Sequence, residues 1–518
     1  MLSTAKLPND INALKALLLL REQALFDLTT TVQHLEATVA SRTQEIERLK
    51  LLLDKLKRMY FGRRSEKLAR QIEQLELELE DLQTSAAEQA PASAPVESTP
   101  RPRPPRKPLP DHLPRDTQIH QPEADACPRC GGAWRQIGEE VAEVLEYVPA
   151  SFRVVRHVRP KYTCTCCDCM TQAAAPSRPI ARSFAGPGLL AHVLISKFCD
   201  HLPLYRQSQI YAREGVELDD STLADWVGGC SKLLRPLVDA LQQYVFSAHK
   251  LHADDTPVPV LAPGKGRTKT GRLWTYVRDD RPAGDDTPPA VWFAYSPDRQ
   301  GQHPQNHLKD FNGILQADAY AGYGKLYETG AILEAACWAH VRRKFYDLHV
   351  ARPSPLTESA LEQIGALYAI EAEICGSPPD HRREIRQARS RPKLNDLHAW
   401  LTEQLEKLSR KSETTLAIQY ALNHWEALTR FADDGRIEID NNAAERSLRG
   451  IALGRKNFLF LGADAGGERA AAIYSLIGSA KLNALNPEAY LREVLSVIAD
   501  YPVNRVAELL PWRLKSNS

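Results

Sequence analysis

The sequence predicts a multidomain chain in which α+β parts and all-α parts alternate. Three observations indicate this: a leucine seam with a heptad period near the N-terminus, two cysteine clusters around residues 127 and 164, and a series of strand-like segments between residues 250 and 340. At 518 residues the chain is also much longer than a typical domain of about 100–150 residues.

Composition and local pattern suggest where these parts begin and end. We expect a coiled-coil or helical oligomerisation segment at 1–84, a proline-rich linker at 85–115, a zinc ribbon at 116–185, a helix-turn-helix-like region at 186–248, a mixed α/β core at 249–350 and 432–485, a helical insertion at 351–431 and a C-terminal helical tail at 486–518.

The charges of the chain are balanced, with 66 basic and 65 acidic residues. A nucleic-acid partner would therefore need a local basic surface, because association depends on the field at the binding patch. The longest apolar run, Ala13 to Leu20, contains Lys15 and is too short to span a bilayer. We therefore expect a cytoplasmic protein with no membrane partner. Its ten cysteines are then better explained by metal binding than by disulfides.

The N-terminal seam runs from Leu35 through Leu49 and Leu53 to Leu56, with Arg42 at one seam position, and the spacing resumes from Ile72 to Leu82. A 3.5-residue period with flanking Glu and Lys is typical of a coiled coil or a long helical hairpin. A solitary amphipathic helix is the alternative. A coiled coil predicts a homodimer or a higher oligomer.

Two Cys-x-x-Cys pairs flank strand-like sequence, which is the layout of a zinc ribbon. The first pair is Cys127 and Cys130. The second is ambiguous, since Cys164 with Cys167 and Cys166 with Cys169 have the same spacing. We predict that Cys127, Cys130, Cys164 and Cys167 bind one structural Zn²⁺, with Cys166 and Cys169 as alternative ligands. Reduced thiols without a metal are the competing interpretation.

A helix, a glycine turn and a second helix are expected around Tyr205 to Glu214, Gly215 and Ser221 to Trp226. This is the outline of a helix-turn-helix, whose second helix enters the major groove of DNA. Many helical hairpins have the same pattern without contacting DNA. We take Arg206 as a candidate for DNA binding.

The core should contain hairpin-connected strands at Leu251–Leu261, Gly271–Arg278 and Ala290–Tyr295, then a short helix, and then a fourth strand leading to Asp318. This order is that of an RNase H-like fold, in which the fourth strand pairs with the first. Asp254 and Asp318 would then be neighbours. A later helix could aim Glu445 at both aspartates.

Three carboxylates from separate elements suit a catalytic Mg²⁺ (or Mn²⁺) site, because these hard cations prefer oxygen ligands. Two such ions about 3.5–4 Å apart assist an in-line phosphodiester displacement. Acidic residues are common in this chain, so most sets of three acids that resemble a metal site would do so by chance. From the pattern alone, the three acids could also be solvated at the surface or cap helices.

Motifs along nearly the whole chain resemble the large transposase of the bacterial insertion-sequence family sixty-six. They stand in the expected order at Tyr60–Leu68, Cys127–Gly132, His201–Ser208, His252–Pro257, Asp318–Tyr323, Cys337–Lys344 and Asp440–Arg446. The resemblance implies a DDE-type core with Asp254, Asp318 and Glu445 as its metal-binding acids. It also implies inverted-repeat DNA ends as substrate, a target duplex, and two small accessory proteins of the same element.

The first acid motif departs from this family, which usually has Asp-Glu-Thr where this chain has Asp254, Asp255 and Thr256. Asp255 is therefore an auxiliary candidate. His340 could assist at the active site and Arg343 could hold a phosphate, although packing roles explain both equally well. Arg455 and Lys456 are further candidates for contact with the DNA backbone.

The expected function is DNA cleavage and strand transfer by a cytoplasmic bacterial enzyme that associates with the nucleoid when it binds DNA. A structure-selective nuclease with the same acids is one alternative. A DNA-binding regulator whose core is inactive is another. Strand joining separates a transposase from a nuclease, and loss of all metal-dependent cleavage favours the regulator.

Overall fold

The computed structural model describes residues 109–514, apart from gaps at 110, 112, 122–126, 128, 149–150, 263–267, 411, 456 and 459. The coiled coil expected at 1–84 lies outside the described residues, as does most of the linker expected at 85–115. The chain divides into two compact units, and the elements below belong almost wholly to the unit formed by residues 98–260 and 269–518.

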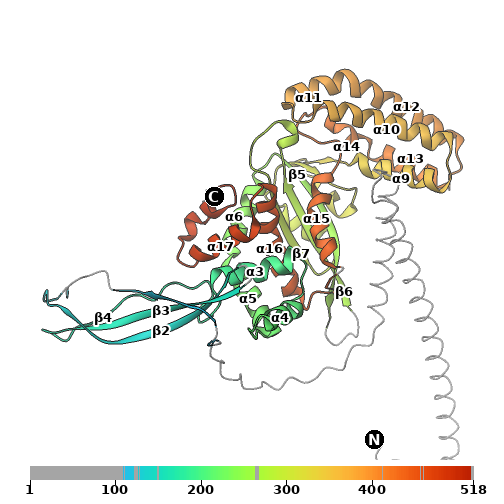
Figure 1. Ribbon diagram of the computed structural model, residues 1–518. Coiled ribbons are helices and arrows are strands. Elements are labelled where there is room, and N and C mark those ends of the chain that lie inside the picture. The colour runs from blue at the N-terminus through green and yellow to red at the C-terminus, as the bar shows by residue number, and fades with distance from the viewer. Residues whose placement is uncertain are drawn as a thin grey trace, which may run out of the picture. The chain divides into compact units, whose positions relative to one another are not determined.

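The first described part is a sheet built on a long antiparallel ribbon (Figure 1). Its strands are β1 (Arg115–Ile119), β2 (Trp134–Val148), β3 (Ser151–Cys164) and β4 (Met170–Gln172). β2 pairs with β3 in a register that places Leu145 opposite Val154 and Trp134 opposite Cys164. Leu145 and Val154 are fully buried. The apolar end of the ribbon is therefore anchored in the core, and the opposite end carries the cysteines.

Four helices follow: α3 (Pro187–Phe198), α4 (Leu204–Arg213), α5 (Asp220–Leu233) and α6 (Arg235–Phe246). A turn at Gly215, which has φ of +83°, separates α4 from α5. Only glycine adopts this left-handed conformation without steric cost. The helix, glycine turn and helix expected here are therefore present. Tyr211 of α4 and Leu223 of α5 are buried in one hydrophobic core.

The second sheet has the order β7-β6-β5-β8-β9. Its strands are β5 (Lys250–Leu261), β6 (Thr268–Arg278), β7 (Ala290–Ser296), β8 (Gly313–Gln316) and β9 (Ile332–Ala335). β8 runs parallel to β5 and to β9, whereas β6 and β7 are antiparallel. The fourth strand lies beside the first, as the sequence pattern predicted. Short helical elements connect these strands: η2 (Arg281–Ala283), α7 (Gln302–His307), η3 (Ala321–Tyr323) and α8 (Gly324–Tyr327).

Two helices near the end of the chain pack on this sheet. α15 (Asn442–Arg455) contacts β6 through the Thr275 and Ser447 hydroxyls, 2.8 Å apart. α16 (Asp464–Leu482) covers the edge strand β7, where the hydroxyls of Ser475 and Ser479 accept backbone N–H bonds at 2.8 and 3.0 Å. These bonds satisfy donors that an edge strand would otherwise expose. The chain ends with α17 (Pro487–Val497) and η6 (Val503–Leu509).

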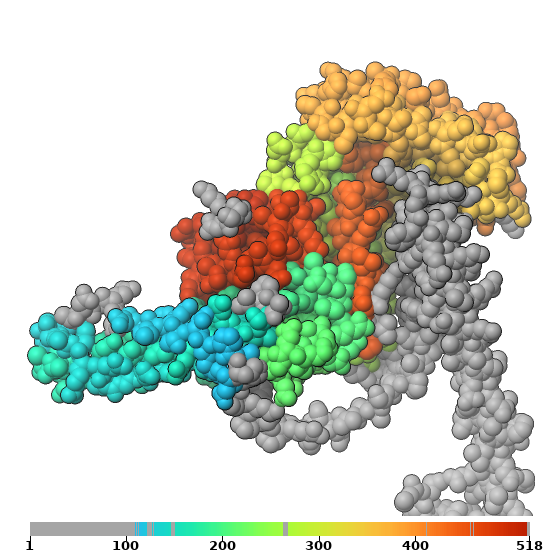
Figure 2. Space-filling view, viewed as in Figure 1, coloured from blue at the N-terminus to red at the C-terminus, as the bar shows by residue number. Residues whose placement is uncertain are grey.

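The helical insertion has a hydrophobic core of its own, which also includes residues of β9 and α9 (Trp338–Ala351). Figure 2 shows its side chains, in yellow and orange, as one continuous surface. Its elements are α10 (Pro355–Ile374), α11 (Pro379–Ile385), η4 (Arg386–Ser390, a π-helix), α12 (Arg391–Lys407), α13 (Glu413–Asn423), α14 (Trp425–Thr429) and η5 (Arg430–Ala432).

Three arginines of the insertion are held by carboxylates. Arg382 and Arg386 are 1% and 0% exposed, and each pairs with a carboxylate: Glu438 for the first and Glu371 for the second. Arg389 pairs with Glu373. Arg386 and Arg389 therefore serve the internal structure of the insertion, whereas Arg382 joins the insertion to the segment that contains Glu438. None of the helices that the structure describes is long and apolar enough to cross a bilayer.

Candidate functional site: a cysteine cluster and an acidic centre

The cysteines lie in two tight turns at one end of the ribbon. In the first turn, the Gly131 N–H donates to the Cys127 carbonyl at 2.8 Å, and Gly131 has φ of +70°. In the second turn, the Asp168 N–H donates to the Cys164 carbonyl at 3.1 Å. Such turns direct their thiols to one side, which is how a zinc knuckle presents two ligands.

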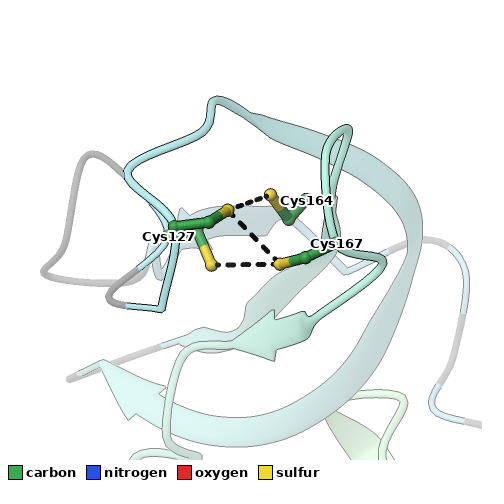
Figure 3. A group of neighbouring side chains, drawn as sticks. Cys127, Cys164 and Cys167 are labelled. Atoms are coloured by element: carbon green, nitrogen blue, oxygen red, sulfur yellow. Dashed lines mark hydrogen bonds between the residues drawn. The ribbon is translucent and has the colours of Figure 1, made fainter.

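The four sulfurs of Cys127, Cys130, Cys164 and Cys167 all lie within 4.8 Å of one another. Cys130 Sγ is 3.3 Å from the sulfurs of Cys164 and Cys167, and Cys127 Sγ is 3.7 Å from that of Cys167 (Figure 3). A backbone N–H bond from Cys166 lowers the pKa of the Cys164 thiol to about 6. Four thiols at these distances have the donor set and spacing of a tetrahedral zinc site.

The two alternative cysteines lie outside this group. Cys166 is exposed, although a Cβ added at Gly132 would come within 2.9 Å of its sulfur. The sulfur of Cys169 lies 3.9 Å from Arg129 Nη1. Of the two spacings in the sequence, the structure therefore brings Cys164 and Cys167 to the first pair.

Asp254 and Asp318 lie on neighbouring segments of the second sheet. The parallel register pairs Leu251 with Leu315 and His252 with Gln316, so Asp254 and Asp318 each lie two residues beyond the last pair. Glu445 lies in the first turn of α15. Asn441, which precedes this helix, joins it to β5: its amide donates to the Ala253 carbonyl at 2.8 Å, and its Oδ1 lies 3.0 Å from His252 Nδ1.

Burial is the main reason why the acids of this centre are hard to ionise. Burial, together with the smaller effects of the charges of Asp318, Asp255 and Glu445, raises the pKa of Asp254 to about 8. Burial also raises the pKa of Asp318, against the lowering effects of Arg299 and His340. Asp318 Oδ1 is buried without a hydrogen-bond partner. Carboxylates that repel one another in a dry site are suited to a cation.

Asp255 has a different environment from Asp254. Its carboxylate is 1% exposed and pairs with Arg272 at 3.0 Å and with Arg299 at 2.9 Å. Arg299 Nη2 also lies 3.7 Å from Asp318 Oδ2, and its guanidinium stacks over the Tyr320 ring at 4.2 Å. Two arginines thus neutralise Asp255. The charge of Asp255 nevertheless still helps to raise the pKa of both Asp254 and Asp318.

Glu445 also belongs to a second group of possible ligands. Atoms of Cys337, His340 and Glu445 all lie within 4.8 Å of one another. Asp254, Asp318 and Glu445 do not form such a close group within the described part of the chain, so their link is the electrostatic one given above. His340 therefore lies close to Glu445, whereas Arg343 is exposed on α9.

The candidates for DNA contact are in different situations. Arg206 is exposed on α4, next to the half-exposed ring of Tyr205. Arg455, the last residue of α15, is half-buried and donates to the Pro257 carbonyl of β5, which is a structural contact. Lys456 lies outside the described residues.

Residues that the sequence motifs did not single out complete this centre. Arg272 and Arg299 are distant in sequence from the acids that they contact, and only the sheet brings them together. Asn441 also belongs to this group, and its bonds to His252 and Ala253 span almost 190 residues. Long-range pairs of this kind leave no local pattern in a single sequence.

Comparisons with known proteins agree with this architecture. A family model described as "Transposase IS66 family" matches residues 182–469. Three further models match the flanking parts: "Transposase C of IS166 homeodomain" at 48–117, "zinc-finger binding domain of transposase IS66" at 124–168 and "IS66 C-terminal element" at 475–512.

Similar full-length proteins occur in Sinorhizobium fredii. The uncharacterized protein y4hP is 42% identical over 494 residues, which cover 91% of this chain and 89% of that protein. The uncharacterized protein y4qI is 37% identical over 537 residues, which cover 100% of this chain and 99% of that protein. The uncharacterized protein y4jD is 41% identical over 418 residues, which cover 79% of this chain and 82% of that protein.

Proposed function

The chain belongs to the IS66 transposase family, and from this premise we propose that it cleaves DNA at the inverted-repeat ends of an insertion sequence and joins those ends to a target duplex. The family matches confirm the resemblance that the sequence motifs indicated. The observation that carries the proposed chemistry is the electrostatic coupling of Asp254 to Asp318 and Glu445 in a buried centre.

An RNase H-like core is the architecture that we propose for the second sheet. Its order, β7-β6-β5-β8-β9, with β8 parallel to β5, supports this interpretation. In such an arrangement the first and fourth strands carry neighbouring acids, and a helix packed on the sheet supplies a third. Asp254, Asp318 and Glu445 follow that plan.

We propose that these three acids hold divalent Mg²⁺ or Mn²⁺. The donors are hard oxygens, and the unpartnered Asp318 Oδ1 supports the fit. Such ions activate an attacking oxygen and stabilise a leaving oxygen in phosphodiester displacement. Asp254 must lose its proton before it can act as a ligand, because burial raises its pKa to about 8. Asn441 fixes the start of α15 against β5 and so sets the position of Glu445.

Arg299 is suited to orienting a DNA phosphate at this centre. Its side chain is 39% exposed while one nitrogen lies within 4 Å of both Asp255 and Asp318. A guanidinium at the border between the acids and solvent can donate to a phosphate and keep its bond to Asp255. Arg272, which is less exposed, then holds Asp255 in place.

For the helical region we propose that α4 contacts the DNA backbone. It exposes Arg206 and Arg213. The exposed start of α5 instead carries Asp219 and Asp220, with Asp225 one turn further on, and these charges would repel phosphates. The expectation that the second helix enters the major groove is therefore not favoured by its charge.

Three further parts of the proposal concern assembly. A structural Zn²⁺ bound by Cys127, Cys130, Cys164 and Cys167 would hold the two turns of the ribbon together. The N-terminal heptads would join two copies of the chain, which suits an enzyme that must hold two DNA ends. The two small accessory proteins of the same element remain the expected partners.

The decisive experiment incubates the full-length protein with end DNA, a target duplex and Mg²⁺. We expect strand cleavage followed by covalent joining of the end to the target. Cleavage without joining would identify a structure-selective nuclease, and specific binding without cleavage would identify a regulator. Substituting Asn for Asp254 should abolish both reactions but retain DNA binding, because binding depends mainly on Lys and Arg contacts with phosphate.

A further inference from the structure

A second group of possible metal ligands includes Glu445 of the acidic centre. Cys337 precedes α9 and His340 lies in its first turn, so the three-residue spacing sets both on one side of the helix start. Their ligand atoms and a carboxylate oxygen of Glu445 are all within 4.8 Å of one another. These donors differ in kind from the three carboxylates. We propose that Cys337, His340 and Glu445 bind Zn²⁺ at a site that competes with the catalytic metal for Glu445.

The donor chemistry favours zinc over magnesium. A sulfur, an imidazole nitrogen and a carboxylate oxygen are all common zinc ligands, whereas Mg²⁺ selects oxygen and disfavours sulfur. Three protein ligands also leave a fourth position for water or an oxygen of DNA. The site is therefore selective among divalent cations even though it shares one acid with the proposed Mg²⁺ centre.

The side chains of Cys337 and His340 are already positioned to act as metal ligands. Cys337 is 2% exposed, and its sulfur accepts the Asn441 N–H at 3.2 Å, which fixes it against the start of α15. His340 Nδ1 is buried and has no hydrogen-bond partner. Burying an imidazole nitrogen costs free energy unless the nitrogen forms a hydrogen bond or binds a metal. The neighbouring Asp318, whose charge interacts with His340, would offset the added positive charge.

Because Glu445 is shared, occupation by Zn²⁺ would draw this carboxylate away from Asp254 and Asp318. Zinc would then inhibit Mg²⁺-dependent cleavage in a manner that rising Mg²⁺ relieves. This consequence rests on the proposed function, whereas the binding of Zn²⁺ to Cys337 and His340 does not. The two can therefore be tested apart.

The binding test uses the full-length protein with zinc already bound at the ribbon cysteines. Equilibrium dialysis should find a second Zn²⁺ per chain, and added Co²⁺ should develop the near-ultraviolet charge-transfer absorption of a thiolate ligand. We expect Cys337→Ser and His340→Gln each to lose this absorption and to weaken the second Zn²⁺ at least about tenfold, a loss typical of a disturbed metal site. Cys375→Ser, which alters an exposed cysteine of the insertion, should change neither.

The activity test compares zinc inhibition in the same variants. Measured against its own rate with Mg²⁺ alone, Cys337→Ser should lose a much smaller fraction of its cleavage to micromolar Zn²⁺ than the unmodified chain loses. If Cys337→Ser and His340→Gln both bind Co²⁺ with an unchanged spectrum, the zinc site does not exist. If the second Zn²⁺ binds through these residues but the protein never cleaves DNA, the site stands and the proposed function falls. Serine keeps an acceptor for the Asn441 N–H, and His340→Gln gives a second variant should Cys337→Ser fold poorly.

Discussion

The guanidinium of Arg382 donates a hydrogen bond to each carboxylate oxygen of Glu438, both at 3.0 Å. Arg382 belongs to α11 of the insertion, and Glu438 lies seven residues before Glu445. Glu438 is also bonded to Gln316, the last residue of β8. The side-chain amide of Gln316 donates to the Glu438 carbonyl at 2.5 Å, and its oxygen accepts from the Glu438 N–H at 3.2 Å. This pair therefore joins the insertion to the segments that carry both Asp318 and Glu445.

Replacing Arg382 with Met should destabilise the protein strongly. It removes both hydrogen bonds from Arg382 to the Glu438 carboxylate and leaves Lys250, at 3.7 Å, to pair with it. Removing one member of a buried ion pair typically costs about 3–5 kcal/mol. Chemical unfolding of the two proteins measures the difference. Arg383→Met is the matched control on the same helix, because Arg383 is half-exposed and its pair with Asp380 is worth about 0–1 kcal/mol.

The double variant Arg382→Met, Glu438→Gln tests the same pair. If the pair is the cause, the double variant should lose less stability than the sum of the single variants, because the contact between Arg382 and Glu438 can be lost only once. Equal losses for Arg382→Met and Arg383→Met would show that the bond to Glu438 contributes little.

Asp254 and Asp255 should respond differently to the loss of their charge. Asp254→Asn should abolish Mg²⁺ binding, because it removes one of the three proposed carboxylate ligands, whose negative charges repel one another. Asp255→Asn should weaken Mg²⁺ binding without abolishing it, since it leaves Arg299 free to draw closer to Asp318. Isothermal titration with Mg²⁺ compares the two variants. If Asp255→Asn alone loses the metal, Asp255 and not Asp254 is the first ligand.

Much of this architecture could be predicted because its signals are local. The strands around Asp254 and Asp318 alternate or run apolar over a few residues, and the paired Cys-x-x-Cys spacing is short enough to be visible in one sequence. Adjacency of the first and fourth strands followed from the order of the elements. The choice between Cys164 with Cys167 and Cys166 with Cys169 did not, because both have the same spacing and only the fold decides which sulfurs meet.

Charge and burial explain what the sequence could not reveal. The arginines of the insertion form a basic cluster in sequence, yet Arg382 and Arg386 are buried against carboxylates that come from other segments. The same holds for Arg455, whose partner is a backbone carbonyl in β5. A cation's partner depends on long-range packing, so its role as a free DNA contact or as an internal ion pair cannot be deduced from its neighbours in the chain.

The ribbon should depend on zinc while the remaining domains do not. Cys127→Ser removes a sulfur from the four that lie within 4.8 Å, so the purified variant should carry about one Zn²⁺ fewer per chain. Elemental analysis gives the zinc content, and limited proteolysis should cut the ribbon first while fragments of the core persist. Cys169→Ser, outside the group, should keep its zinc. Loss of zinc from Cys169→Ser as well as from Cys127→Ser would favour Cys166 and Cys169 as the second pair of ligands.

Metal binding at the acidic centre should depend on pH below about 8. Burial, with the charges of Asp318, Asp255 and Glu445, raises the pKa of Asp254 from 3.8 to about 8, so the metal-free protein keeps a proton there at neutral pH. A metal must displace this proton, and its affinity should rise about tenfold per pH unit up to pH 8 and then level off. Titration in buffers of different ionisation enthalpy should find about one proton released per metal at pH 6.5 and fewer above pH 8.

The same shift predicts how the metal-free protein responds to pH. The pKa of Asp254 is higher in the folded than in the unfolded chain, so between pH 4 and pH 8 the folded state binds more protons. Folding stability from this group is therefore present at low pH and is lost as the pH rises toward 8. Asp254→Asn should remove this contribution and so flatten the decline in thermal stability over that range. A decline of equal slope in Asp254→Asn and in the unmodified protein would mean that the carboxyl ionises normally, and the buried, mutually repelling acids would then not be the source of the metal's pH dependence.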